Sequence, residues 1–346
     1  MGRSDYIGKD LSIISLIKDM PGNDTIRRAA EECCQVFCSG RYQRVCVSIS
    51  GGSDSDVLID LCTRCDPGKR FTYVYCDTGL EYQATKDHLD YLEDHYGIKI
   101  RRLKSQMQIP QSCEISQPFL SKMVSTYIGR LLSYGFRYEN ESFNVLYARY
   151  PRCKAALQFW CNEFGEGSKF NIDRYPYLKE FMIQNPPQFR IGARCCKDAK
   201  LDPIYELSRE KKFDLHVMGV RKAEGGQRGS ISKTLSVKSN EPDLFRPLLH
   251  FTDRDKAAYN RHFGIKNSAC YAQYGLCRTG CAGCPCGRKH YRELEICDRF
   301  EPELANVARK SFSESYHYEQ EYRIYRKQQQ LHSKGVMTLW DYGMPS

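Results

Sequence analysis

The chain has 346 residues, of which 41% are hydrophobic, and it carries a formal net charge of +10. This is the composition of a globular protein with one large domain or two smaller ones. No apolar run approaches the roughly 18 residues that span a bilayer, and no secretion signal precedes the first predicted helix. We therefore expect a cytoplasmic protein with no membrane partner, and the positive charge favours an anionic ligand.

Strand and helix patterns alternate in the first hundred residues. The predicted elements are a helix over Thr25–Cys38, a strand over Val45–Ile49, a helix over Asp56–Cys62, a strand over Phe71–Cys76, a helix over Tyr82–Tyr96 and a strand over Ile98–Leu103. This alternation predicts an α/β fold with a parallel sheet and crossover helices. Ligands of such sheets bind beyond the carboxyl ends of the strands.

The remainder of the chain is predicted to be mostly helical. Residues 108–190 are helical and aromatic, typical of an insertion that covers an active site, and the sheet resumes with a strand over Leu215–Val220 and a helix over residues 254–265. The predicted organisation is an N-terminal helical segment at 1–40, an α/β domain at 41–107 and 191–266, the insertion at 108–190, and a cysteine-rich loop with C-terminal helices at 267–346.

The junction between the first strand and its helix reads Ser50-Gly51-Gly52-Ser53-Asp54-Ser55. Adjacent glycines allow positive φ angles and a close approach of the backbone to a ligand. The first turn of the following helix offers unpaired N–H groups and the positive end of the helix dipole. The junction therefore predicts a phosphate-binding loop. It lacks the Gly-Lys-Ser/Thr of a Walker A loop, and a simple capping turn is the alternative.

Four further motifs follow in order. They are Asp77-Thr78-Gly79-Leu80-Glu81, Arg194-Cys195-Cys196-Lys197-Asp198-Ala199-Lys200 before Pro203, Gly219-Val220-Arg221-Lys222-Ala223-Glu224 with Arg228, and Phe245-Arg246-Pro247-Leu248 before Thr252. A carboxylate at Asp77 suits a ribose hydroxyl, the adenine side or Mg²⁺, with helix capping as the alternative. The cations of these motifs suit phosphate or sulfate, and ordinary surface charge is their alternative.

The order and spacing of these five motifs, over roughly residues 40–290, resemble the phosphoadenosine phosphosulfate (PAPS) reductase family of the PP-loop ATP pyrophosphatase superfamily. The resemblance implies a PP-loop domain of the adenine nucleotide alpha hydrolase-like fold that binds ATP or another adenylyl nucleotide with Mg²⁺. It implies catalytic roles for Ser53, Asp54, Lys200 and Arg221. The implied nucleotide-binding residues are Ser50, Gly51, Gly52, Ser53, Asp54, Ser55, Asp77, Thr78, Gly79, Arg194, Gly219, Arg221 and Arg228.

The chain has 18 cysteines, and one group of them is spaced for metal binding. The Gly-Cys-x-x-Cys-Pro sequence at residues 280–285 brings two thiolates together, and an upstream cysteine suits either an iron–sulfur cluster or zinc. The resemblance favours a 4Fe-4S cluster, with zinc as the alternative. The predicted ligands are Cys270, Cys281, Cys284 and Cys286, and Cys277, Cys195 and Cys196 are alternatives for the fourth position.

Reductases of this family attack sulfur with a cysteine in a Glu-Cys-Gly-Leu/Ile-His tail, and the last ten residues of this sequence contain no cysteine. The first hypothesis is therefore an enzyme that adenylates an acceptor with ATP and then transfers sulfur to it, similar to the cluster-bearing proteins of DNA phosphorothioation. Its expected partners are a sulfur donor, a cysteine desulfurase or thioredoxin-like reductant, and nucleic acid as one candidate acceptor.

Two alternatives are retained. One is a PAPS or adenosine phosphosulfate reductase that uses a cysteine elsewhere, such as Cys286 or Cys297. The other is a zinc-stabilised protein that binds nucleic acid without turnover, although no basic arm for nucleic acid is evident. The sequence makes no prediction about the oligomeric state.

Overall fold

The structure is a computed structural model that describes residues 18–66 and 68–334. These residues form two compact units. The sheet unit contains the described residues up to Ser105 together with Lys200–Cys281, and the helical unit contains Gln106–Ala199 and the described residues from Ala282 onward. Each unit is built from two separate stretches of the chain.

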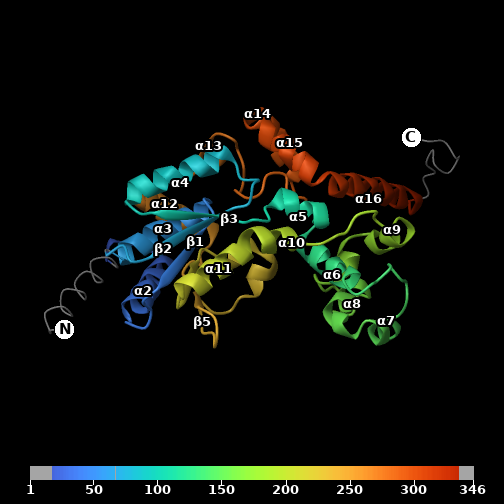
Figure 1. Cartoon of the computed structure of the whole chain (residues 1–346), viewed down its shortest axis with the longest axis horizontal. Helices are drawn as coiled ribbons and strands as arrows, with labels where there is room; N and C mark the ends of the chain where they lie inside the picture. Colours follow the sequence, from blue (N-terminus) through green and yellow to red (C-terminus); the bar gives the residue numbers. More distant parts are fainter. Residues whose placement is uncertain (1–17, 67, 335–346) are drawn as a thin grey trace. The chain divides into compact units, whose positions relative to one another are not determined.

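The sheet unit contains a six-stranded sheet with the order β3-β2-β1-β4-β6-β5 (Figure 1). The strands are β1 (Val45–Ile49), β2 (Thr72–Asp77), β3 (Ile100–Lys104), β4 (Leu215–Met218), β5 (Leu235–Ser236) and β6 (Asp243–Phe245). All neighbouring strands are parallel except β5 and β6, which are antiparallel. The predicted α/β fold with a largely parallel sheet is confirmed.

The predicted strands agree with β1 to β4. The strand predicted at Val45–Ile49 has the same bounds in the structure, and the ends of the other three differ by no more than two residues. β5 and β6 were not predicted, because two- and three-residue strands are too short to show a hydrophobic period. The helices around the sheet are α2 (Asp24–Cys38), α3 (Ser53–Cys65), α4 (Gln83–Tyr96), α11 (Asp202–Lys211), α12 (Asp253–Phe263) and α13 (Ala269–Ala272).

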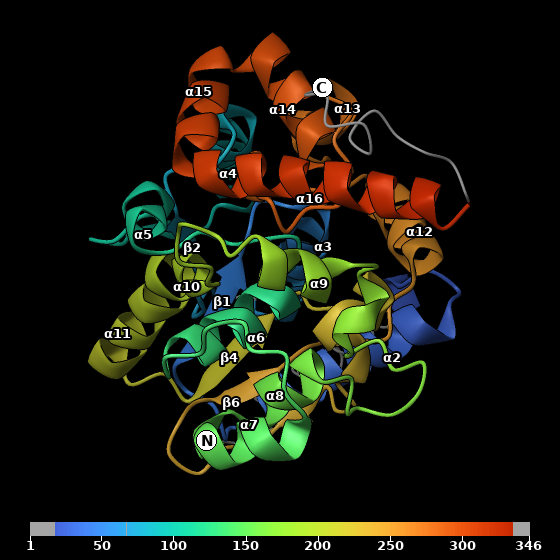
Figure 2. The ribbon, with the colours of Figure 1, turned by 90° about the vertical axis from the view of Figure 1, so that its right-hand side faces the viewer.

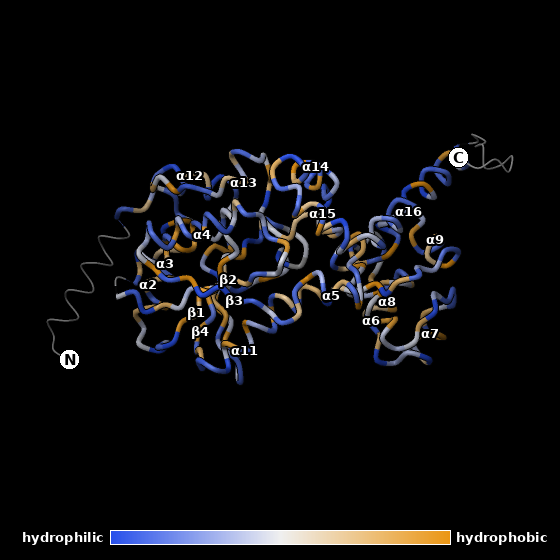
Figure 3. The backbone as a smooth tube through the Cα atoms, turned by 45° about the horizontal axis from the view of Figure 1, so that its top comes forward, coloured by the Kyte–Doolittle hydropathy of each residue, from blue (hydrophilic) through white to orange (hydrophobic). Residues whose placement is uncertain are grey.

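Apolar side chains cover both faces of the sheet. Successive residues of a strand point to opposite faces, so Val45 and Val47 join a core with α2, α3, α4 and α12, whereas Cys46 packs with Leu207 and Phe213 beside α11. Hydrophobic colour accordingly marks β1 and β4 in Figure 3. The sheet is thus held between helices, with the ends of its strands left available for a ligand.

The helical unit has a core of its own, formed by both of its chain stretches. Its helices are α5 (Ile109–Ile115), α6 (Lys122–Leu132), α7 (Phe143–Arg149), η1 (Pro151–Cys153), α8 (Lys154–Trp160), η2 (Ile172–Arg174), α9 (Leu178–Gln184), α10 (Arg194–Cys196), α14 (His290–Phe300), α15 (Pro302–Ser311) and α16 (Ser313–His332). Tyr318 and Tyr322 of α16 are buried with Trp160 and Phe181. Figure 2 labels α6, α8, α9 and α16 among the helices of this unit. The Gln117 side chain accepts the N–H of Ser315 at 3.0 Å and so fixes the start of α16.

A π-helical turn, η3 (Lys197–Leu201), carries the chain from the helical unit to the sheet unit. Across residues 18–66 and 68–334, every helix is too short or too polar to cross a membrane.

Asp60 ties α3 to two other helices. This buried carboxylate accepts hydrogen bonds from Tyr259 of α12 at 2.7 Å, from Tyr96 of α4 at 3.3 Å and from Arg64 at 2.6 Å. Replacing it by alanine leaves a buried phenol without its acceptor. We expect Asp60→Ala to lower the free energy of unfolding by about 2–4 kcal/mol, measured by urea denaturation. The exposed Asp94→Ala in α4 is the control, and equal losses in both variants would contradict this role.

His216 makes the stability depend on pH. Burial, reinforced by the positive charge of Arg246, lowers its pKa to about 4, and its ring is hydrogen-bonded to Ser48. In the unfolded chain a histidine takes up its proton near pH 6.5. The unfolded state therefore binds more protons between those values, and stability falls as the pH drops from about 6.5 to about 4. His216→Asn should flatten this part of the stability profile, and an unchanged slope would contradict the assignment.

Candidate functional site

The candidate site lies where the strand order changes direction. β1 lies between β2 and β4, so the chain leaves the carboxyl ends of β1 and β4 toward opposite sides of the sheet, where α/β folds bind ligands. Ser50–Ser55 follows β1, and Gly219–Arg221 follows β4. A Cβ atom at Gly219 would lie 3.3 Å from the carbonyl oxygen of Asp54, so the two loops approach each other closely.

Neither of the two loop glycines has room for a side chain. Gly51 has a φ angle of +65°, and a Cβ atom there would lie 2.6 Å from Thr85. A Cβ atom at Gly52 would lie 2.8 Å from the hydroxyl of Thr279. Both residues are buried, and their N–H groups make no hydrogen bond within the part of the chain that the structure describes. Buried N–H groups without an acceptor are rare in proteins, so this turn is suited to an anion.

Hydrogen bonds hold the serines of the loop in place. The hydroxyl of Ser55 accepts the Ser50 N–H at 2.8 Å and lies 3.0 Å from the Ser50 hydroxyl. The Ser53 N–H donates to the hydroxyl of Tyr271, in α13, at 3.0 Å. The loop therefore keeps its shape without a ligand.

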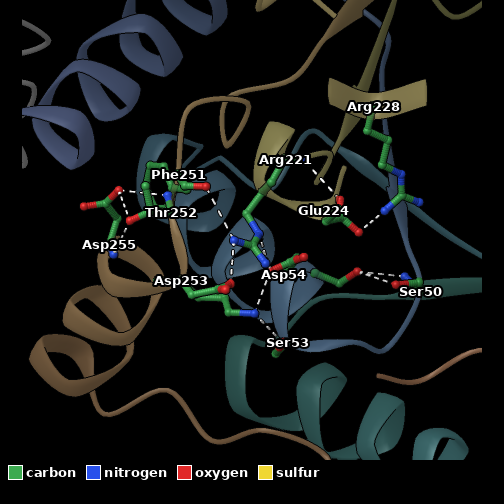
Figure 4. A network of polar contacts seen from close by, with 12 residues as sticks. Ser50, Ser53, Asp54, Arg221, Glu224, Arg228, Phe251, Thr252, Asp253 and Asp255 are labelled. Carbon is green, nitrogen blue, oxygen red and sulfur yellow. Dashed lines mark hydrogen bonds and ion pairs between the residues drawn. The ribbon is translucent and has the colours of Figure 1, made fainter. Parts of the chain in front are cut away.

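Arg221 is the central cation of the site (Figure 4). Its side chain is only 6% exposed, and Nε lies 2.8 Å from Oδ1 of Asp54. Nη1 lies 3.0 Å from Asp253 and 3.4 Å from the carbonyl oxygen of Phe251. Glu224 accepts the Arg221 N–H at 3.1 Å and pairs with Arg228. The predicted residues Asp54, Arg221 and Arg228 thus belong to one polar network.

Two residues of this site were missed by the sequence analysis. Lys256 of α12 lies 3.0 Å from Oδ1 of Asp54 and donates to the Ser53 hydroxyl at 2.9 Å. Tyr271 contacts the loop as described. Lys256 lies in a helix whose hydrophobic pattern reflects its buried face, and Tyr271 lies in the cysteine-rich stretch. The sequence around these residues gave no local sign that they contact the loop. The capping box of Thr252 and Asp255 indicates where α12 begins, and therefore that Lys256 lies in its first turn. It does not indicate a contact with the loop.

The Asp77–Glu81 segment forms a closed turn at the end of β2. Asp77 accepts the Gly79 N–H at 3.0 Å, and Glu81 accepts the Thr78 N–H at 2.8 Å as well as its hydroxyl. Burial raises the pKa of Glu81, and the positive charge of Lys200 opposes that shift. The positive charge of Lys200 therefore favours the charged form of Glu81. Asp77 is half-buried at the end of β2.

Arg194 belongs to the helical unit. Its Nε lies 2.8 Å from Asp198, which also accepts a hydrogen bond from Ser112 at 2.8 Å. Its predicted role in nucleotide binding stays a prediction.

The predicted metal ligands are divided between the units. In the sheet unit, Cys270 lies 3.5 Å from the Thr85 hydroxyl, and Cys281 lies 3.6 Å from the Thr78 hydroxyl. In the helical unit, a hydrogen bond to Cys284 raises the pKa of Cys286 well above its usual range.

Two more cysteines contact this second pair. A hydrogen bond to Cys113 raises the pKa of Cys195, and Cys284 adds to that shift. Four thiols of the helical unit thus interact, contributed by α5, α10 and the loop before α14.

None of the 18 cysteines forms a disulfide. Within residues 18–66 and 68–334, no three or more His, Cys, Asp or Glu side chains are arranged so that they could hold a metal ion.

Two solved structures are similar to this chain. PAPS reductase from Candida auris, in a phosphate complex, is 12% identical, with 78% of this chain and 93% of that chain covered and a TM-score of 0.41. The U34-tRNA thiolase from Methanococcus maripaludis with its [4Fe-4S] cluster is 13% identical, with 86% and 80% covered and a TM-score of 0.35.

The sequence is also 29% identical, over 271 residues, to an uncharacterized 37.8 kDa protein of Escherichia phage 186, covering 76% of this chain and 72% of that protein. The family model described as the phosphoadenosine phosphosulfate reductase domain matches residues 44–123 and 169–286. This match contains the glycine loop, Asp77, Arg221 and the predicted metal ligands Cys270, Cys281, Cys284 and Cys286, and it covers more than half of the chain. The chain therefore belongs to the phosphoadenosine phosphosulfate reductase domain family.

Proposed function

We propose that the sheet unit binds ATP or another adenylyl nucleotide and that the protein adenylates an acceptor and then transfers sulfur to it. The observation that carries this proposal is the pair of buried N–H groups at Gly51 and Gly52, which have no acceptor within the described residues and lie at the start of α3. A phosphate oxygen supplies the missing acceptor and is favoured by the helix dipole.

In the proposed first step, an oxygen of the acceptor attacks the α-phosphorus of ATP, and the bond from that phosphorus to the bridging oxygen breaks. Pyrophosphate leaves with the electron pair. The glycine N–H groups would stabilise the charge that develops on the leaving group, because fixed donors need no reorganisation during the reaction. Arg221, whose guanidinium is held by Asp253 and Phe251, would neutralise the same charge.

In the second step, a sulfur nucleophile attacks the adenylated carbon or phosphorus of the acceptor, and AMP leaves. Hydrosulfide as the donor gives the thio product directly. The terminal sulfur of a cysteine persulfide instead forms an S–S bond to the acceptor, which a thioredoxin-like reductant then cleaves with two electrons. The acceptor is a small molecule or a nucleic acid.

Mg²⁺ fits the site through Asp77. Its carboxylate is half-buried at the end of β2 and makes one described hydrogen bond, to Gly79, so oxygen lone pairs remain for a hard cation. Asp54 fits less well, because two cations already contact its Oδ1. The ion would neutralise phosphate charge.

The chemistry of the donors, rather than their arrangement, suits an iron–sulfur cluster in the helical unit, since Cys195, Cys284 and Cys286 offer soft sulfur atoms that interact electrostatically. These three residues would hold it, and the predicted ligands Cys270 and Cys281 belong to the sheet unit. A bound cluster would supply iron able to carry sulfur.

Reduction of PAPS is the second candidate, and family membership favours it. Turnover assays with ATP and with PAPS plus a thioredoxin reductant separate the two reactions. Release of AMP and pyrophosphate from ATP supports the proposal. Formation of sulfite from PAPS, with ATP left intact, supports the second candidate instead.

Gly52→Ala tests the loop. The backbone at this residue is extended, with a φ angle of −97°, so alanine can adopt it, but its Cβ would press against Thr279 and Tyr271. We expect turnover to fall about a hundredfold, as when fixed donors are displaced from a developing charge, with little change in Tm.

The matched control is Gly229→Ala, where a Cβ meets no atom within 4 Å. Equal activity of both variants would contradict the assignment of the loop.

Metal analysis tests the cysteine prediction. After anaerobic purification we expect iron and sulfide in equal amounts and a broad absorbance near 400 nm, as for a thiolate-bound cluster. Cys284→Ser should lose most of the iron, whereas Cys161→Ser, whose thiol donates to a carbonyl oxygen of Glu141, should keep it. Zinc in place of iron would contradict the cluster and favour a structural metal.

A further inference from the structure

Two cations share one carboxylate beside the glycine loop. Arg221 and Lys256 both contact a single carboxylate oxygen, Oδ1 of Asp54, at 2.8 and 3.0 Å. The N-terminus of α3 adds its own positive dipole at the same place. Asp253 also pairs with Arg221, but its side chain is 84% exposed and faces water.

Lys256 is held in this position by the fold. The capping box of Thr252 and Asp255 fixes the first turn of α12, and Asn23 donates to Asp255 at 2.6 Å. Its ammonium also donates to the Ser53 hydroxyl at 2.9 Å. A cation beside a helix N-terminus is unfavourable unless an anion lies between them. Only 20% of the side chains of Lys256 and Asp54 is exposed, so water screens this charge weakly.

We propose that Lys256 is a phosphate-binding residue of the loop and that the carboxylate of Asp54 competes with a phosphate oxygen for Lys256 and Arg221. On nucleotide binding, the pyrophosphate portion takes over the contacts to Lys256 and Arg221, and Asp54 is released from them. This inference rests on the proposed nucleotide function and adds one residue and one exchange of partners to it.

The proposal predicts effects of opposite sign for two neighbouring residues. Removing the ammonium of Lys256 weakens binding of an anion, whereas removing the charge of Asp54 strengthens it, because the internal competitor is lost. A purely structural role of both residues would weaken binding in both variants.

The experiment is calorimetric titration of the full chain with inorganic pyrophosphate in a chelator, so that no divalent ion contributes. We expect Lys256→Met to bind about ten- to a hundredfold more weakly, as for loss of a charge-assisted hydrogen bond. Lys256→Arg should stay within about threefold of the natural protein, and Asp54→Asn should bind several-fold more tightly. Arg261→Met, on the same helix but in its exposed last turn, is the matched control and should be unchanged.

Two outcomes separate this inference from the proposed function. If the natural protein binds neither pyrophosphate nor ATP, the proposed function itself fails. If it binds them and Lys256→Met binds equally well, or Asp54→Asn binds more weakly, the inference is wrong and the proposed function stands. Should Lys256→Met fail to fold, the Lys256→Arg and Asp54→Asn titrations still decide the question.

Discussion

The close approach of backbone at the end of β1 is the constraint on which the rest of the site depends. Gly51 lies against Thr85 of α4, and Gly219 lies against the backbone of Asp54, so a side chain at either position would push loop and helix apart. Because α3 begins directly after this turn, the same packing that buries Val57 and Leu58 in the core also aims the helix N-terminus beyond the sheet. The anion site is thus a consequence of how the sheet packs on α3 and α4.

The charges of the site follow from that packing. Arg221 is almost fully buried by the turn after β4, and a buried guanidinium is costly without acceptors. Inside the fold, Asp54 supplies a counter-charge 2.8 Å from Nε, and the carbonyl oxygen of Phe251 accepts a hydrogen bond from Nη1. This arrangement keeps Arg221 ordered before a ligand arrives, so that little conformational entropy is lost on binding. Asp54 is the partner of Arg221 within the fold, which would explain why an acidic residue stands in a loop suited to phosphate.

Much of the sheet unit could be predicted because its signals are local. The apolar run Val45–Ile49 and the glycines after it specify strand, turn and helix within about ten residues, and the structure has the strand at the same bounds. Lys256 and Tyr271 reach the loop from more than 200 residues away in the chain, as the separations of 203 and 218 residues show. No periodicity records such contacts, since they depend on the strand order β1-β4-β6 and on the angle at which α12 leaves the sheet. Trp160 and Tyr318 pack in one core, and this contact could not be predicted from the sequence for the same reason.

The cysteines illustrate how one residue type serves two purposes. Cys33 and Cys62 lie inside helices on their buried faces, and burial is the main cause that raises their pKa values, so they remain protonated and pack as small apolar side chains. In the helical unit, the pKa values of Cys195 and Cys286 are raised first by hydrogen bonds that these thiols donate to Cys113 and Cys284. Protons shared between sulfur atoms are those that a metal would displace, because thiolates are the ligands. Binding of a metal to these thiols would therefore release protons, and raising the pH should favour it. The thiols of α2 and α3 should show no such dependence on pH.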